Sequence, residues 1–366
     1  MSFTSSFFLL LFFPVFILFY LIFPKLRCYT LLIASYIFYG AFSPSFLIHL
    51  LFSTVLTYSA GYMLSRRFTC RGKKLLLAVS LILNFSVLLF YKYADFAIAA
   101  VSKLAGLFSS TPLSPAPGGS IVDLILPVGL SFFIFQSTTY LIDTYRGDTP
   151  ICKNFFKYAL FVSFFPSITS GPILKSKEFL PQLQKKITVS FTGFRDGSLR
   201  FLWGMFQKMV IADRLAVVTG TAFSNYESYE GFTLFFCAVL YAVQIYTDFA
   251  GYSEMAIGLA HMLGFRIPAN FERPYFASSI HSFWRRWHIS LTSWFREYLY
   301  FPLGGSRKGH FRKYINILII FLVSGLWHGA GYQFIIWGLL HGIYQIVGQL
   351  FAPAKISLYR KLHFRT

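Results

Sequence analysis

The sequence has 366 residues, of which 56% are hydrophobic and 13% charged, with a net charge of +20. Mean hydropathy is +0.59. This composition excludes a soluble monomer and an extended disordered chain, because so few charges cannot cover so much apolar surface. The basic residues fall in short loops between apolar runs, which is typical of membrane orientation and lipid headgroup contact rather than nucleic-acid binding.

Apolar runs separated by polar connections follow one another along the chain. They cover residues 7–23, 29–42, 46–65, 75–93, 121–142, 198–219, 232–250, 314–329 and 332–351. These runs predict an all-α, polytopic membrane helical bundle of roughly 9–11 spans plus re-entrant segments, because one spanning helix takes about 20 residues. The first run is expected to be a retained span rather than a signal peptide, and residues 1–366 are expected to form a single domain.

The connections differ in charge. Basic residues gather at 66–74, 174–186 and 307–313, whereas the Pro- and Ser-rich connection 109–120 has none. The positive-inside rule therefore places the N-terminus outside and the basic loops in the cytoplasm. The weakly amphipathic stretch 174–195 is expected to lie along the cytoplasmic surface.

Two stretches are too mixed for simple spans. Pro166, Gly171 and Pro172 interrupt 158–173, and 265–305 packs charged and aromatic residues together. Irregular backbone is not stable when it faces lipid, so these stretches must be buried in protein or line a water-filled cavity. They predict an interior site.

His328 is the first candidate for that site. It lies among small residues, in the sequence SGLWHGAG (324–331), at the end of an apolar run. Small residues permit close helix approach and leave space beside the imidazole, and an ionisable group within the membrane indicates function. The alternative is a core histidine that a backbone carbonyl satisfies.

A second histidine, His288, follows two arginines in the sequence FWRRWHISL (283–291). Arg285 and Arg286 would suit an anionic substrate, or they extend to lipid headgroups, and both interpretations remain open. His281 precedes His288 by two helical turns, but the spacing matches no metal motif, and the four cysteines show no pairing pattern. No bound metal or cofactor is expected.

Acidic residues are scarce, and two of them lie in or near the span 232–250. Asp248 and Glu254 occur in the sequence YTDFAGYSEMAIG (246–258). Structural pairing within the bundle is favoured for both, because buried charges are usually partnered. Asp248 is retained as a candidate substrate-binding residue.

These motifs resemble the membrane-bound O-acyltransferase family, in particular its bacterial branch of alginate and peptidoglycan O-acetylation proteins. The similarity rests on four sequence elements. They are LPVGLSFFIFQSTTYLIDTYRG (126–147), FFPSITSGPI (164–173), the long run 246–305, and SGLWHGAG (324–331). The resemblance covers most of 30–350, with its core motifs at about 121–350.

The resemblance implies a central funnel through which an acyl group passes from a cytoplasmic donor to a hydroxyl on the other face. It makes His328 and His288 the catalytic pair. Arg285, Arg286, Trp327 and Asp248 are the substrate-binding candidates. The implied donor is acetyl-CoA. The implied acceptor is an extracytoplasmic SGNH-type partner protein or a glycan such as alginate or peptidoglycan. The implied location is the cytoplasmic membrane.

Several alternatives stay open. The acyl group could be D-alanyl or another group delivered by a carrier protein, and transfer could be direct or pass through an acyl-histidine. A transporter or flippase of lipid-linked glycans, or a scaffold for a secreted acetyltransferase, would also use basic mouths and interior histidines. Many relatives continue beyond the point where this sequence stops, with further spans that are either dispensable here or supplied by a partner.

Overall fold

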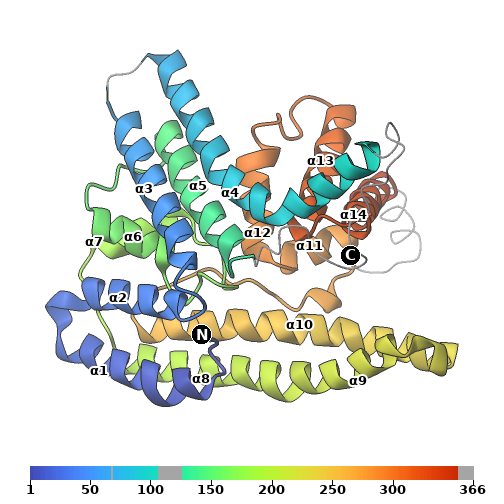
Figure 1. Ribbon diagram of the computed structural model, residues 1–366, viewed down its shortest axis with the longest axis horizontal. Coiled ribbons are helices and arrows are strands. Elements are labelled where there is room, and N and C mark those ends of the chain that lie inside the picture. Colours follow the sequence, from blue (N-terminus) through green and yellow to red (C-terminus); the bar gives the residue numbers. More distant parts are fainter. Residues whose placement is uncertain (67–68, 106–125, 353–366) are drawn as a thin grey trace, which may run out of the picture. The chain divides into compact units, whose positions relative to one another are not determined.

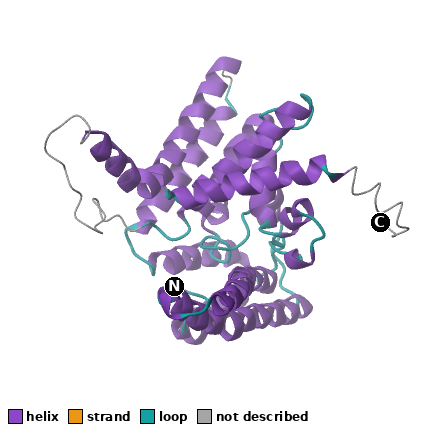
Figure 2. Cartoon of the chain, turned by 90° about the vertical axis from the view of Figure 1, so that its right-hand side faces the viewer, coloured by secondary structure: helices purple, strands orange, loops and turns teal. Residues whose placement is uncertain are grey.

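The computed structural model describes residues 1–66, 69–105 and 126–352, and side chains within 99–105 are left undescribed. Throughout these ranges every regular element is helical, and Figure 2 shows helices and loops without strands. The predicted all-α class is confirmed. The connection 109–120 and the start of the run 121–142 lie outside the described residues.

The chain divides into two compact units. Unit 1 comprises residues 1–85 and 127–271, and unit 2 comprises 86–126 and 272–366. Helix α4 (Cys70–Ala105) belongs partly to each unit.

Unit 1 contains the larger set of helices (Figure 1). They are η1 (Phe8–Phe12), α1 (Phe13–Ile22), η2 (Pro24–Leu26), α2 (Arg27–Gly40), α3 (Phe46–Leu64), α5 (Leu130–Arg146), α6 (Phe155–Ser163), α7 (Ser176–Gln184), α8 (Phe191–Phe206), η3 (Gln207–Ala212), α9 (Asp213–Ser224), η4 (Tyr226–Ser228) and α10 (Gly231–Met262). Beyond its share of α4, unit 2 contains η5 (Pro274–Phe276), α11 (Ile280–Arg286), α12 (Ile289–Phe295), η6 (Arg296–Tyr300), α13 (His310–His328) and α14 (Tyr332–Leu350).

Among the described residues, three helices are long and apolar enough to cross a membrane. They are α3, the 70–98 part of α4, and α10. A fourth candidate is the pair 8–22 and 24–40, which bends by 108°. The other predicted runs also contain helices, but these helices do not meet the length and hydropathy criteria for a span. The three or four candidate spans are therefore fewer than the roughly 9–11 that the apolar runs predict.

Helices α8 and α10 run side by side in unit 1, and their backbones touch at two levels (Figure 1). A Cβ on Gly204 would lie 2.4 Å from the carbonyl oxygen of Gly251, and one on Gly197 would lie 2.6 Å from that of Gly258. Neither position has room for a side chain. This is the small-residue packing that apolar helices use where lipid offers no hydrophobic driving force.

The two mixed stretches are irregular, as the sequence predicts. In the first, α6 ends at Ser163, and Phe164 and Phe165 are fully buried in the turns before α7. The second stretch contributes η5, α11, α12 and η6, none longer than 7 residues. Short helices with sharp junctions let this stretch surround a cavity within unit 2.

Candidate active site

A cavity of about 700 Å³ opens within unit 2, between α11, α12, η6, α13 and α14. Both candidate histidines line it. The full lining is His281, Trp284, Arg285, Trp287, His288, Leu291, Thr292, Phe295, Arg296, Tyr300, Lys313, Ile317, Ile320, Phe321, Ser324, His328, Gln345, Gln349 and Ala352. The cavity is therefore apolar along much of its wall, with a small set of polar and cationic groups, which is the usual character of a small-molecule site.

His288 lies at the junction between α11 and α12. Ser279 caps the start of α11, accepting a hydrogen bond from the Ser282 N–H at 3.1 Å, and α11 ends at Arg286. His288 then adopts a left-handed conformation, with φ +43° and ψ +55°, and is only 3% exposed. Such backbone conformations are costly for a non-glycine residue and cluster at functional sites. The junction thus turns the His288 imidazole into the cavity wall.

His328 is the last residue of α13, and it is an exposed residue that lines the cavity. Helices α13 and α14 are held together by glycines on both sides. A Cβ on Gly325 would lie 2.2 Å from the Phe334 carbonyl oxygen, and one on Gly338 would lie 2.4 Å from that of Phe321. The close helix approach that the small residues predict is therefore present, and it places His328 at the cavity rather than in a closed core.

Trp327 contacts both histidines without being part of the cavity lining. Its ring centroid lies 6.0 Å from that of His288 and 4.6 Å from that of His328, edge-on in each case. On another side, His328 meets Trp337 at 5.0 Å, and Trp337 meets His341 at 4.8 Å. The two imidazoles therefore share one indole as a wall, and aromatic rings fix the space around His328.

The cavity is positively charged. Arg285, Arg296 and Lys313 line it, and its lining includes no carboxylate. This arrangement suits an anionic ligand, such as one with phosphates. Arg286 is not part of the lining, and its Nη1 donates to the Phe276 carbonyl at 3.5 Å. Sequence reasoning missed Arg296 and Lys313, because only the fold shows that η6 and α13 reach the same cavity.

His288 lies outside the candidate spans, and its electrostatics follow from its burial. Burial, with a smaller contribution from the neighbouring His328, lowers the pKa of the His288 imidazole to about 3. The ring is therefore neutral near pH 7, with one nitrogen that donates and one that accepts a hydrogen bond.

Asp248 and Glu254 lie in unit 1, and both are ion-paired there. The carboxylate of Asp248 lies 2.6 Å from Lys208 Nζ, which also contacts Asp213 at 2.8 Å. Glu254 Oε1 accepts a hydrogen bond from Arg200 Nη2 at 3.1 Å. Structural pairing, the interpretation that the sequence favours, is thus what these two carboxylates show. Within the described residues, no group of three or more metal-ligating side chains could hold an ion.

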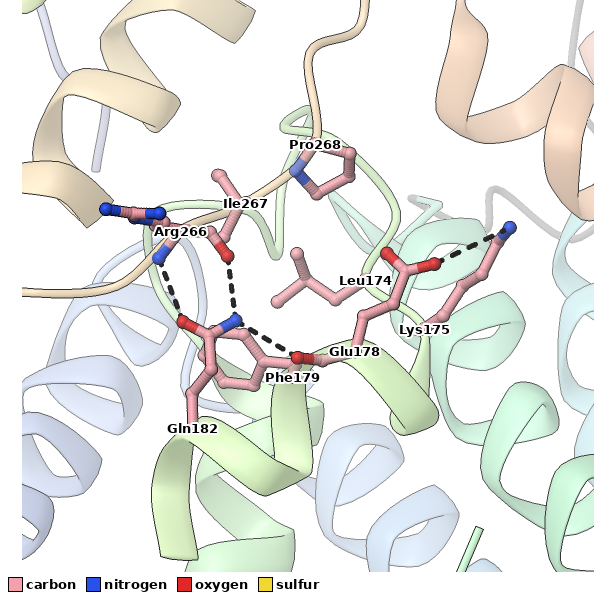
Figure 3. A pocket seen from close by; sticks show the side chains of 8 residues that line it. All are labelled: Leu174, Lys175, Glu178, Phe179, Gln182, Arg266, Ile267 and Pro268. Atoms are coloured by element: carbon pink, nitrogen blue, oxygen red, sulfur yellow. Dashed lines mark hydrogen bonds and ion pairs between the residues drawn. The ribbon is translucent and has the colours of Figure 1, made fainter. Parts of the chain in front are cut away.

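A smaller cavity of about 240 Å³ lies in unit 1, beside α7 (Figure 3). The Gln182 amide donates to the Arg266 carbonyl and accepts from its N–H, both at 2.9 Å, and Glu178 lies 4.0 Å from Lys175 Nζ. The lining contains no histidine, cysteine or hydroxyl side chain. Its polar groups tie α7 to the chain that follows α10, which is a structural role.

Comparison with known proteins identifies the family. The model of MBOAT, the membrane-bound O-acyltransferase family, matches residues 151–355. The chain is 41% identical over 348 residues to a protein of Pseudomonas putida named "Probable alginate O-acetylase AlgI", covering 94% of this chain and 70% of that protein. It is 36% identical over 369 residues to the "Peptidoglycan O-acetyltransferase" of Helicobacter pylori, covering 94% and 67%.

A more distant relative is named for a different activity. The "Teichoic acid D-alanyltransferase" of Bacillus subtilis is 28% identical over 244 residues, covering 63% of this chain and 60% of that protein. The chain belongs to the membrane-bound O-acyltransferase family, and it spans 60–70% of the length of these three relatives. These matches confirm the predicted family and its bacterial O-acetylation branch. They also confirm a multi-pass membrane O-acyltransferase.

Proposed function

We propose that this protein transfers an acetyl group from cytoplasmic acetyl-CoA to a hydroxyl on the other side of the cytoplasmic membrane. The acceptor is an SGNH-type partner protein or a cell-surface polysaccharide of the alginate or peptidoglycan type. The single observation that carries the proposal is a basic cavity of about 700 Å³ that both His288 and His328 line. The names of the two relatives that match over 94% of this chain support acetyl as the acyl group.

The chemistry requires a base, because an alcohol is a weak nucleophile near neutral pH. In the proposed mechanism, His328 takes the hydroxyl proton while the oxygen attacks the thioester carbonyl. The carbon–sulfur bond then breaks, and the CoA thiolate leaves with the proton from the His328 imidazolium. The exposure of His328 at the cavity is consistent with access for both substrates.

His288 is assigned a hydrogen bond to the carbonyl oxygen as negative charge develops on it. A neutral, buried imidazole with a donor N–H suits this role, because a fixed donor in a dry site stabilises the oxyanion strongly. Trp327 is assigned to the wall between the two imidazoles.

The donor's phosphates are assigned to the cations of the cavity. Arg285, which the sequence predicts, is joined in this role by Arg296 and Lys313. Arg286 is assigned to its contact with the Phe276 carbonyl in η5, and Asp248 to its ion pair with Lys208. These two assignments narrow the set of substrate-binding residues that the sequence proposes.

The test uses the purified protein in liposomes that enclose acetyl-CoA labelled in its acetyl group, with alginate or peptidoglycan fragments outside and, in a second series, a candidate SGNH-type protein. Label on the outside acceptor, with unlabelled CoA retained inside, supports the proposal. Efflux of intact labelled acetyl-CoA, or no CoA release with any acceptor, contradicts it. A parallel reaction with a D-alanyl carrier protein tests for D-alanyl transfer, the activity for which the more distant relative is named.

A further inference from the structure

One short segment of α4, residues 92–96, packs within unit 2 against the end of α13 that holds His328. The Tyr93 hydroxyl donates a hydrogen bond to the Leu326 carbonyl oxygen. The Phe96 ring meets Tyr332 edge-on, with centroids 6.1 Å apart. These contacts fix the register of α4 beside the candidate active site.

The same register places a lysine over an aromatic face. The Lys92 ammonium lies 5.5 Å from the centroid of the Trp327 indole, within the distance of a cation–π contact, for which tryptophan is the strongest partner. Lys92 belongs to the 70–98 part of α4, a candidate span. A lysine in a membrane segment is costly and indicates function, because a neutral residue would cross the membrane more favourably.

We propose that Lys92 is a positioning residue for acyl transfer: its ammonium holds the Trp327 indole, and that indole orients the His288 and His328 imidazoles. The indole contacts both rings edge-on, so a shift of the indole moves both groups at once. Small misplacements of reacting groups reduce rates strongly. This inference rests on the proposed acyl-transfer function.

The first experiment compares single variants in the liposome assay, with the folded fraction of each determined by size-exclusion chromatography. Lys92→Met is expected to lower kcat about ten-fold, because it removes one partly desolvated cation–π contact that holds the indole in place. The KM for acetyl-CoA should stay unchanged, because Lys92 does not line the cavity. Lys92→Arg should restore most of the rate, since a guanidinium also binds an indole face. Lys74→Met, the matched change at an exposed lysine of the same helix, should behave as wild type.

A double-mutant cycle then tests whether Lys92 acts through Trp327. In a Trp327→Leu background, Lys92→Met should cause no further loss of kcat, because the face that it holds is gone. An equal loss in both backgrounds would overturn the proposal and indicate that Lys92 acts independently of Trp327. A graded series that keeps Lys92 gives an independent check. The rate should fall in the order Trp, Phe, Leu at position 327, and equal rates for Trp and Phe would also count against the proposal.

The outcomes separate this inference from the function on which it rests. If wild type transfers no label, the proposed function fails. If wild type is active, His328→Ala is inactive and Lys92→Met matches Lys74→Met, only the role of Lys92 is wrong.

Discussion

Both units bring two helices into close contact through glycines, but the charged groups near the contact differ between the units. In unit 1, glycines bring α8 and α10 into backbone contact, and the nearby charges are paired: Lys208 with Asp213 and Asp248, and Arg200 with Glu254. In unit 2, glycines bring α13 and α14 together, but the adjoining cavity has three cations and no carboxylate in its lining. Close packing alone therefore does not mark a site. A basic cavity beside two histidines does.

The largest expected effect comes from the base. His328→Ala should lower acetyl transfer by about 10³-fold or more, because it removes the group that takes the proton. Folding should stay intact, because His328 is an exposed residue at the end of α13. His310→Ala, the matched change at the exposed other end of α13, should leave the rate unchanged. Measuring label transfer for both variants decides the point. Near-normal transfer by His328→Ala would show that His328 is not the base.

The glycine contacts provide a second way to break the comparison. An added Cβ at Gly204 or Gly325 must push two helices apart, at a cost of about 1–3 kcal/mol. Gly204→Ala should lower the unfolding temperature but keep kcat per folded molecule. Gly325→Ala should lower both, because α13 holds His328.

The control for these variants is Gly220→Ala on α9, where a new Cβ meets nothing within 4 Å. It should be neutral or slightly stabilising. Equal kcat values for the Gly204→Ala and Gly325→Ala proteins would show that the α13–α14 contact does not position the site.

The helices and their close contacts could be predicted from the sequence, because apolar runs and small residues are local features of the chain. Each predicted run contains a helix within its described residues, and the two mixed stretches are irregular. The left-handed backbone of His288, the cations Arg296 and Lys313, and the contact of Lys92 with Trp327 could not be predicted. Each of these depends on which elements meet in space, and a single sequence does not specify that for segments this far apart.

The two adjacent arginines of α11 sharpen the electrostatic side of the comparison. Arg285→Gln should raise the KM for acetyl-CoA about ten-fold with little change in kcat, since it removes a charge that binds donor and transition state alike. Arg286→Gln should change the KM much less, because its guanidinium faces the Phe276 carbonyl. Steady-state kinetics over a range of acetyl-CoA concentrations separates the two. Equal increases in KM would mean that Arg286 contributes to donor binding as much as Arg285.

The smallest expected effect concerns pH. Because burial lowers the pKa of His288 to about 3 in the folded protein, the unfolded state, with a histidine pKa of about 6.5, binds more protons between these values. The stabilisation from the neutral ring is therefore complete above about pH 6.5 and is lost progressively as the pH falls toward 3. On going from pH 7 to pH 5, wild type should lose about 1–2 kcal/mol more than His288→Asn.

Asparagine suits this comparison because it tolerates the left-handed backbone and does not titrate. Thermal unfolding of both proteins in detergent at the two pH values gives the difference directly, and titration of all other groups cancels in it. Parallel losses in the two proteins would mean that the imidazole of His288 reaches water. The dry, neutral donor that the mechanism assigns to this position would then be absent.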